Sequence, residues 1–374
     1  MSRVLVIQAP GVISFSAEPL PALQAHDVLV RTLFSGISTG TELTAYRGSN
    51  PYLHKRWDAH RRLFVADGAP HFAYPLAGWG YEEVGAVIAV GSAVGDVAIG
   101  QRVYGAWGHR SHAVLSAEHA RTHRLPAQIE PILGVFARIG AIALNGILDA
   151  QINLGETVAV FGLGVVGQLA AQLARLSGAE VIGIDLHAAR LELAQRLGAA
   201  TVLAAGEGHV AERIKELTQG RGADVCIEAS GSTAALHEAI RACAYASRVV
   251  ALGFFQGEAR DLWLGEEFHH NRITLVCSQI GGVRPDLSQR WDRLRLESTF
   301  MRLLAEARIQ ARPLITHVVP VEQAAALFAL LDRHPETALQ TVLAFGDEGE
   351  QDGAGPRPAS PPPAGSADRP PPSA

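Results

Sequence analysis

A glycine-rich turn between two apolar runs is the feature that most constrains the fold of this chain. Residues 157–161 are apolar, residues 162–167 have the spacing G-x-G-x-x-G, and a helix-like stretch then leads to a second apolar run at 181–184. The first glycine permits a tight turn, the second lets the backbone approach a pyrophosphate, and the third lets the helix pack close to the strand. Free N–H groups at the start of that helix would face the phosphates. This order predicts a dinucleotide-binding unit whose cofactor contacts come from Gly162, Leu163, Gly164, Val165, Val166 and Gly167.

The acidic residue after the second apolar run refines the cofactor prediction. Asp185 ends that run, at about the 20-residue spacing expected of the acid that binds the cofactor ribose. A carboxylate there accepts hydrogen bonds from the ribose 2′-hydroxyl and repels a 2′-phosphate, which favours NAD over NADP. Arg190, on the next helix, favours NADP instead, because an arginine can accommodate the 2′-phosphate. The alternative role of Asp185 is to cap a helix over residues 187–198.

Composition narrows the class of protein and its partners. Of the 374 residues, 48% are hydrophobic and 18% charged, and the net charge of −5 is unlike that of a protein that binds nucleic acid or an anionic membrane. The three cysteines, Cys226, Cys243 and Cys277, form no C-x-x-C pattern, so we expect neither a disulfide framework nor a four-cysteine zinc site. The first apolar run is too short for a signal peptide. We therefore expect a cytoplasmic protein that acts on a small molecule, with neither nucleic acid nor membrane as partner.

The first part of the chain is predicted to be rich in β-structure. Residues 1–147 contain short β-like runs separated by turn residues, at 4–8, 27–32, 82–90, 102–106 and 112–117. Residues 48–75 lack a clear period, and a long irregular segment inside a compact domain is typically a functional loop or lid.

The central part alternates between strand-like and helix-like segments. Strands are predicted at 157–161, 181–184, 201–203, 224–228, 248–252 and 274–278, and helices at 166–177, 187–198, 208–219 and 233–245. Six strands joined by helical crossovers predict a doubly wound parallel sheet. Ligands of such sheets bind beyond the carboxyl ends of the strands, where the sequence places Asp185, Ser230, Gly253 and Phe254.

The last part of the chain divides into an ordered segment and a tail. Helices are predicted at 297–310 and 321–333, and strands at 317–320 and 339–345. From residue 346 to 374 the sequence is rich in Pro, Gly, Ser, Ala and Asp and lacks an apolar period, which predicts disorder.

This layout resembles that of the medium-chain dehydrogenase/reductase superfamily. Segments 35–42, 80–85, 95–103 and 224–231 resemble four of its motifs, among them Gly-Ile-Cys-Gly-Thr-Asp and Gly-His-Glu. The resemblance implies an α/β fold, with a Rossmann doubly wound parallel sheet and a GroES-like β-rich catalytic domain. It also implies boundaries: a catalytic domain at 1–147, a Rossmann domain at 148–280 and a return segment at 281–345 that completes the catalytic domain. Members are often homodimers or homotetramers, and the apolar run 273–277 is a candidate sheet edge for pairing between subunits.

Two departures from the superfamily pattern concern its metal. In zinc-dependent members, the Cys and the His of the first two motifs bind catalytic zinc. Here those positions carry Ser38 (or Thr39) and Tyr81, and hydroxyl groups are poor ligands for Zn²⁺. Glu82 alone would not hold the ion, so we predict no metal site and no zinc. The variant motifs are similar to those of the branch that contains bacteriochlorophyllide dehydrogenase.

Without a metal, hydride transfer to a nicotinamide needs a positioned proton donor or acceptor. Tyr81 is the first candidate, because it stands where a zinc ligand would be; a base role requires a cation that lowers its pKa, whereas a donor role does not. Thr41 corresponds to the hydroxyl that relays protons in zinc alcohol dehydrogenases, and Ser38 could donate to the substrate oxygen. Glu42 and Glu82 are expected nearby, where they could tune Tyr81 or form ion pairs. The alternative for the hydroxyl groups is an ordinary core or turn hydrogen bond.

Three functions fit these observations. The first is a zinc-free oxidoreductase that transfers a hydride between NAD(H) and a secondary alcohol or ketone. The second is an NADPH-dependent quinone or enone reductase, which also needs no zinc but is disfavoured by Asp185. The third is a catalytically silent relative that binds a nucleotide.

Overall fold

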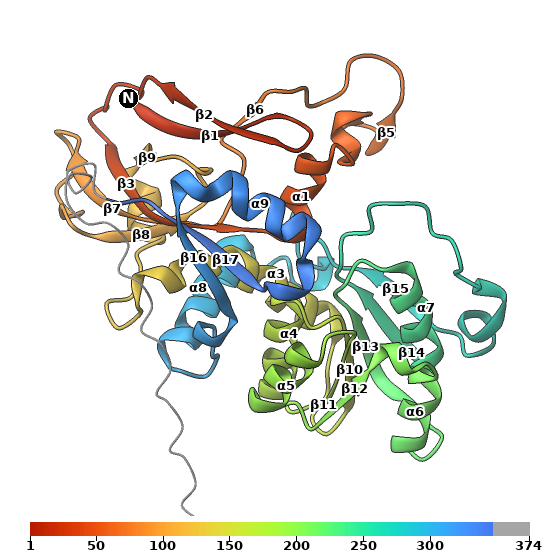
Figure 1. The fold of residues 1–374 in the computed structure, drawn as a ribbon. Helices are drawn as coiled ribbons and strands as arrows, with labels where there is room; N and C mark the ends of the chain where they lie inside the picture. The colour runs from red at the N-terminus through yellow and green to blue at the C-terminus, as the bar shows by residue number, and fades with distance from the viewer. Residues whose placement is uncertain (347–374) are drawn as a thin grey trace, which may run out of the picture.

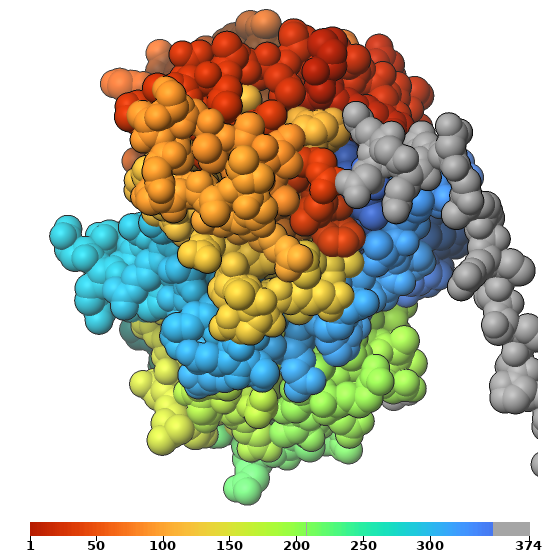
Figure 2. Space-filling view, turned by 90° about the vertical axis from the view of Figure 1, so that its left-hand side faces the viewer, coloured from red at the N-terminus to blue at the C-terminus, as the bar shows by residue number. Residues whose placement is uncertain are grey.

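The described chain forms two structural parts, one rich in β-structure and one built on a parallel sheet. The structure is a computed structural model, and it describes residues 1–346. Figure 1 shows the β-rich part, which contains both the start and the end of the described chain, above the helix-covered parallel sheet. Figure 2 shows residues of the last described segment, in blue, between the β-rich part and the parallel-sheet part. The tail for which the sequence predicts disorder, 346–374, lies outside the described residues except for Gly346.

The parallel sheet has the strand order that the sequence predicts for a Rossmann fold. Its six strands run in the order β12-β11-β10-β13-β14-β15, and all neighbouring pairs are parallel. The strands are β10 (Thr157–Phe161), β11 (Glu180–Asp185), β12 (Thr201–Ala204), β13 (Ala223–Glu228), β14 (Cys243–Ala251) and β15 (Thr274–Cys277). The crossover helices are α4 (Val165–Leu176), α5 (Ala188–Arg196), α6 (Val210–Leu217) and α7 (Thr233–Ala242). The predicted fold class is confirmed.

Alternation along the central strand explains why helices cover both faces of this sheet. Val158 and Val160 of β10 pack in the cluster that contains α4, whereas Ala159 and Phe161 pack in the cluster that contains α6 and α7. Successive side chains of a strand point to opposite faces, so an uninterrupted apolar strand requires a cover on each side.

The β-rich part is completed by a strand from the end of the described chain. One sheet has the order β16-β17-β3-β7-β8, with β9 also paired to β3, and a smaller sheet has the order β2-β1-β6. β17 is antiparallel to β3, with Thr341 opposite Ile37. The strands are β1 (Ser2–Ala9), β2 (Val12–Glu18), β3 (Asp27–Ile37), β6 (Leu76–Ala77), β7 (Glu83–Val90), β8 (Arg102–Gly105), β9 (His112–Ser116), β16 (Ile315–Pro320) and β17 (Gln340–Ala344). Helix α9 (Ala324–Arg333) connects β16 and β17.

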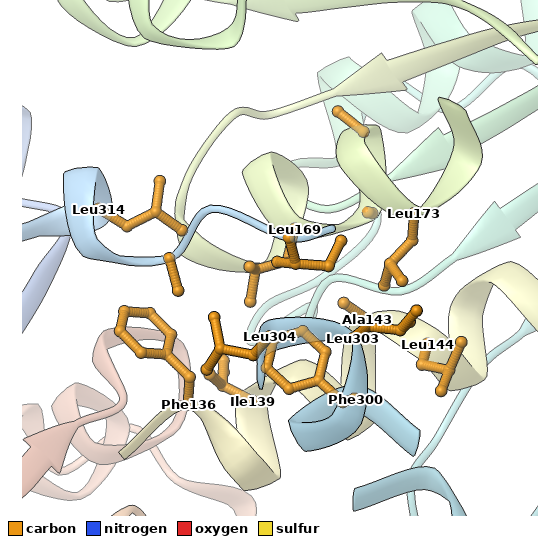
Figure 3. Packing of buried hydrophobic residues seen from close by; sticks show 14 of the residues in the cluster. Phe136, Ile139, Ala143, Leu144, Leu169, Leu173, Phe300, Leu303, Leu304 and Leu314 are labelled. Carbon is orange, nitrogen blue, oxygen red and sulfur yellow. The ribbon is translucent and has the colours of Figure 1, made fainter. Parts of the chain in front are cut away.

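Helices in the first part of the chain are a difference from the sequence prediction, which named β-like runs and loops over residues 1–147. They are α1 (Thr39–Arg47), α2 (Ala117–Thr122) and α3 (Phe136–Ala150). Helix α3 packs between α4 and α8 (Arg293–Ala305), and Figure 3 shows Phe136 and Ile139 beside Phe300 in this core. A Cβ on Gly140 would lie 2.3 Å from the Phe300 ring, so glycine is what allows α8 to approach. The stretch Pro131–Ala150 is apolar and long enough to cross a membrane, but 72% of its most apolar window is buried, as in a core helix.

The irregular segment 48–75 forms a small hairpin supported by aromatic contacts. It contains β4 (Arg56–Asp58) and β5 (Leu63–Val65), which pair antiparallel. The Tyr52 ring lies 5.1 Å from the ring of Phe64 and 5.3 Å from that of Phe72. The prediction that this segment is a lid stays a prediction.

Candidate active site

A cleft between the two parts brings together most of the residues that the sequence singled out. Its volume is about 430 Å³. From the β-rich part it is lined by Ser38, Thr41, Tyr81 and Glu82, and from the Rossmann part by Gly162, Gly164, Val165, Val166, Asp185, Arg190, Ser230, Gly253 and Phe254. Three predicted site residues lie behind the wall rather than in it: Glu42, Leu163 and Gly167. The tertiary fold thus places the motif for the cofactor and the candidate proton-transfer groups in a common cavity.

The glycine turn at the Rossmann wall has the geometry that a dinucleotide requires. Gly162 has φ +87°, and a Cβ there would lie 2.6 Å from Ser230 Cβ. A Cβ on Gly167 would lie 1.8 Å from the carbonyl oxygen of Gly162, so only glycine lets α4 approach the turn. Gly164, the N-cap residue of α4, has no atom within 4 Å of such a Cβ. The open side of the turn therefore faces the cleft, where the N–H groups of the helix can bind an anion.

Asp185 supports this turn from the end of β11. One carboxylate oxygen accepts a hydrogen bond from Leu163 N at 2.7 Å and the other from His187 N at 2.9 Å. The N-cap residue of α5 is His187, so Asp185 does not itself occupy the capping position. Only 7% of Asp185 is exposed, and its exposed edge lines the cleft. A ribose diol can therefore add hydrogen bonds to a carboxylate that the backbone already orients.

Arg190 is held by the protein on the same side of the cleft. Its Nη1 lies 3.9 Å from Asp185 Oδ2, and its Nη2 donates to the carbonyl oxygens of Pro335 at 2.7 Å and Ala338 at 3.2 Å. These acceptors hold the guanidinium group in place, and the group would have to turn away from them to bind a 2′-phosphate.

Three hydroxyl groups form a connected set on the opposite wall. The Tyr81 phenol is hydrogen-bonded to Ser38 Oγ and lies 3.3 Å from Thr41 Oγ1. Ser38 precedes α1, and its backbone N–H donates to Glu42 Oε1 at 2.8 Å. Both of these partners of Tyr81 thus lie at the N-terminal end of α1.

The surroundings of Tyr81 disfavour the base role, which is one of the two roles that the sequence left open. Burial, and then the charge of Glu82, raise the pKa of Tyr81 above the ordinary value of a phenol. A base role required a shift in the other direction, because only the phenolate accepts a proton. Tyr81 therefore stays protonated at neutral pH and can serve as a hydrogen-bond donor.

Behind this wall lies a buried network that the sequence did not predict. His109 Nε2 donates to Glu42 Oε2 at 2.6 Å, and His109 Nδ1 lies 2.6 Å from Ser35 Oγ. Ser35 in turn donates to Glu83 Oε1 at 3.0 Å. Burial alone lowers the pKa of His109, but the charges of Glu42 and Glu83 outweigh this effect and raise it. Glu42 is thus the partner of a buried histidine. A local sequence motif could not predict this contact, because the two residues lie far apart in the chain.

Glu82 differs from its acidic neighbours because half of its carboxylate is free. Its Oε2 accepts a hydrogen bond from Gln340 Nε2 at 2.9 Å, whereas its buried Oε1 has no hydrogen-bond partner among the described residues. Burial, and then the charge of Glu42, raise the pKa of Glu82 well above the ordinary value of a carboxyl group. Gln340 comes from β17, so the last described strand contributes to the site.

Several residues of the cleft fall outside every sequence motif. Arg47, at the end of α1, lines it and donates from Nε to Asp332 Oδ1 at 2.6 Å. Gln256 Nε2 donates to Gly40 O at 2.9 Å and so connects the two walls. An isolated Arg or Gln carries no recognisable pattern, which is why only the fold identifies these residues.

The donor set of the cleft does not fit a zinc ion. The two positions that resemble zinc-ligand positions carry Ser38 and Tyr81, which are bonded to each other. Among residues 1–346, no group of three or more His, Cys, Asp and Glu side chains is arranged to hold a metal ion. None of the three cysteines lines the cleft.

Comparisons with known proteins agree with this architecture. A family model described as "Zinc-binding dehydrogenase" matches residues 165–295. D-guloside 3-dehydrogenase from Shigella flexneri is 32% identical over 351 residues, which cover 92% of this chain and 100% of that protein. The D-guloside 3-dehydrogenase of Escherichia coli (strain K12) matches with the same identity and coverage. The crystal structure of 2R,3R-butanediol dehydrogenase from Bacillus subtilis superposes with a TM-score of 0.74 at 19% identity and covers 92% of this chain and 100% of that one, which shows the fold alone.

Proposed function

Because the chain belongs to the medium-chain dehydrogenase/reductase superfamily of NAD(P)-dependent, alcohol dehydrogenase-like oxidoreductases, we propose that it oxidises a secondary hydroxyl group of a sugar or glycoside, with NAD as hydride acceptor and without a metal ion. The observation that carries the proposal is the common cleft, in which Ser38, Tyr81 and Glu82 face the glycine turn that starts at Gly162.

The ribose end of the cleft is the part that distinguishes NAD from NADP. When bound, NAD supplies the hydride acceptor. The carboxylate of Asp185 attracts a ribose diol and repels a phosphate in its place. Arg190, the one residue that favoured NADP in the sequence, is already occupied by Asp185 and two carbonyl oxygens. These contacts favour NAD.

The polarity of the opposite wall suits a particular class of substrate. Ser38, Thr41 and Tyr81 present hydroxyl groups there, and Gln256 and Gln340 add amide groups. Such donors and acceptors suit a substrate with several hydroxyl groups. The curated relative of highest identity reported above is named for oxidation of a D-guloside at position 3, which is a secondary alcohol on a sugar ring.

The proposed reaction requires few groups from the protein. Tyr81 or Ser38 donates a hydrogen bond to the substrate oxygen in the cleft. The donor set argued above gives no thiolate or imidazole to a zinc ion, so polarisation of the oxygen falls to hydrogen bonds. The quinone or enone reductase alternative has no observation in its favour beyond the lack of zinc ligands.

Turnover with a chelation control tests the proposal. Purified protein is assayed by NADH absorbance with NAD⁺ or NADP⁺ and with methyl D-guloside, sorbitol and butane-2,3-diol as probes. We expect turnover of the glycoside with NAD⁺, unchanged after dialysis against EDTA and with substoichiometric zinc by elemental analysis. Stoichiometric zinc whose removal abolishes turnover would contradict the metal-free reaction, and enone reduction in place of alcohol oxidation would contradict the reaction class.

A further inference from the structure

We propose that Glu82 is the group that accepts the proton of the substrate hydroxyl in the oxidation direction and returns it in the reduction direction. The inference rests on the dehydrogenase function proposed above and adds the residue that moves the proton.

The hydrogen bonds around Glu82 leave one of its oxygen atoms for a ligand. Gln340 holds Oε2 at 2.9 Å, which fixes the rotation of the carboxylate, and Oε1 has no partner among the described residues. Glu82 is only 1% exposed, yet it lines the cleft beside Tyr81. A buried acceptor without a hydrogen bond is destabilising, and more so when it is charged. A substrate O–H in the cleft would relieve this effect.

The other acids near the cleft lack such a free oxygen. Glu42 uses one oxygen for Ser38 N and the other for His109. Glu83 uses one for Ser35 and the other for the backbone N–H of Trp107 at 2.8 Å. Both oxygens of Asp185 accept backbone N–H groups. Glu42 and Glu83 do not line the cleft, and Asp185 lies at its ribose end, so Glu82 is the carboxylate beside Tyr81 whose described surroundings leave one oxygen without a hydrogen-bond partner.

The charges around Glu82 suit proton transfer in both directions. Glu42 and Glu83 are its acidic neighbours, and His109 lies between these two. The cation Arg138 of α3 pairs with Glu297 at 2.8 Å rather than with Glu82. Burial, and then the charge of Glu42, raise the pKa of Glu82 well above its ordinary value, and this favours the protonated form that donates to a ketone.

In the oxidation direction the carboxylate form is needed, and the positive charge of the oxidised cofactor in the same cleft favours it. The substrate C–H bond breaks, and its electron pair leaves with the hydride for the nicotinamide. The O–H bond breaks, and its proton forms a bond to Glu82 Oε1. The electron pair of that O–H bond becomes the second bond of the carbonyl group, so atoms and charge balance. Ser38 or Tyr81 holds the oxygen throughout.

The substitution Glu82→Gln tests the inference because it keeps the shape and the Gln340 contact but removes the titrating group. We expect kcat for oxidation of methyl D-guloside to fall by about 10²- to 10⁴-fold. NADH affinity, measured by fluorescence titration, should stay within about threefold of wild type, since the carboxylate does not hold the nucleotide. The wild-type rate of oxidation should rise with pH through one ionisation, and this rise should be lost in the variant.

Stability separates the proposed role from a structural one. A group whose pKa is raised by folding weakens the fold as pH increases through that pKa, because burial disfavours its charged form. Glu82→Gln should therefore be at least as stable as wild type in urea at pH 8. The variant Glu180→Gln, at the exposed far end of β11, is the matched control and should change neither rate nor stability.

The outcomes are distinct. Glu82→Gln with wild-type kcat and an unchanged pH profile would overturn the inference, and so would a variant that fails to fold, because the free oxygen would then have a structural partner. Wild-type protein without turnover of any alcohol would instead contradict the proposed function.

Discussion

Two glycines of the turn should separate cofactor binding from folding when each is replaced by alanine. Gly164 has φ −65°, which alanine adopts without strain, and a Cβ there meets no atom within 4 Å. A Cβ on Gly167 would lie 1.8 Å from the carbonyl oxygen of Gly162, which is backbone and cannot rotate away. We therefore expect Gly164→Ala to fold normally and bind NADH poorly, and Gly167→Ala to lose stability.

The size of both effects follows from these contacts. The methyl group of Gly164→Ala would occupy the space where the backbone meets a pyrophosphate. Loss of one charge-assisted hydrogen bond to that group, worth about 1.5–3 kcal/mol, raises the Kd for NADH about 10- to 150-fold. At an N-cap, alanine in place of glycine changes stability by less than about 1.5 kcal/mol. Overpacking of the kind in Gly167→Ala costs about 1–3 kcal/mol or more.

Two measurements on each variant decide the matter. NADH fluorescence titration gives the Kd, and urea denaturation gives the free energy of unfolding. The reasoning would be refuted if Gly164→Ala bound NADH within about threefold of wild type, or if it lost as much stability as Gly167→Ala.

Three further predictions concern the ribose acid, the buried ion pair and the sheet edge. Asp185→Asn should reduce the preference for NADH over NADPH by about 10-fold or more, since the charge that repels a 2′-phosphate is removed; an unchanged ratio of the two Kd values would argue against a ribose-binding role. Glu42→Gln leaves His109 buried without its anionic partner and should lower the free energy of unfolding in urea by about 3–5 kcal/mol. Because Glu42 helps raise the pKa of His109 above its ordinary value of 6.5, this loss should be full below pH 6.5 and shrink as pH rises through the folded-state pKa; a loss that grows with pH would contradict the pairing. Thr274→Lys with Val276→Lys, on the edge strand β15, should convert the expected homodimer or homotetramer into monomers by light scattering, and an unchanged mass would exclude this edge as the interface.

The elements that the sequence predicted correctly are those whose signal is local. The strands β10 and β11 and the turn between them follow from apolar runs of strand length and from glycines whose spacing is set by one turn of chain. Helix α3 was not predicted: most of its residues are buried between α4 and α8, and the periodicity of a largely apolar run does not by itself separate a buried helix from buried strands.

The candidate site divides in the same way between sequence and tertiary structure. The sequence by itself determined the glycine turn, Asp185, and the hydroxyl groups at Ser38 and Tyr81, because motifs keep these residues in fixed local order. Only the tertiary structure decided which groups they meet: His109 lies 67 residues from Glu42 in the chain, and Gln340 lies 258 residues from Glu82. Packing of the last described strand against β3 makes the second contact, and burial raises the pKa of Glu82 and Glu83. Neither effect can be predicted from the spacing of residues in the sequence, because both depend on which surfaces the folded chain brings together.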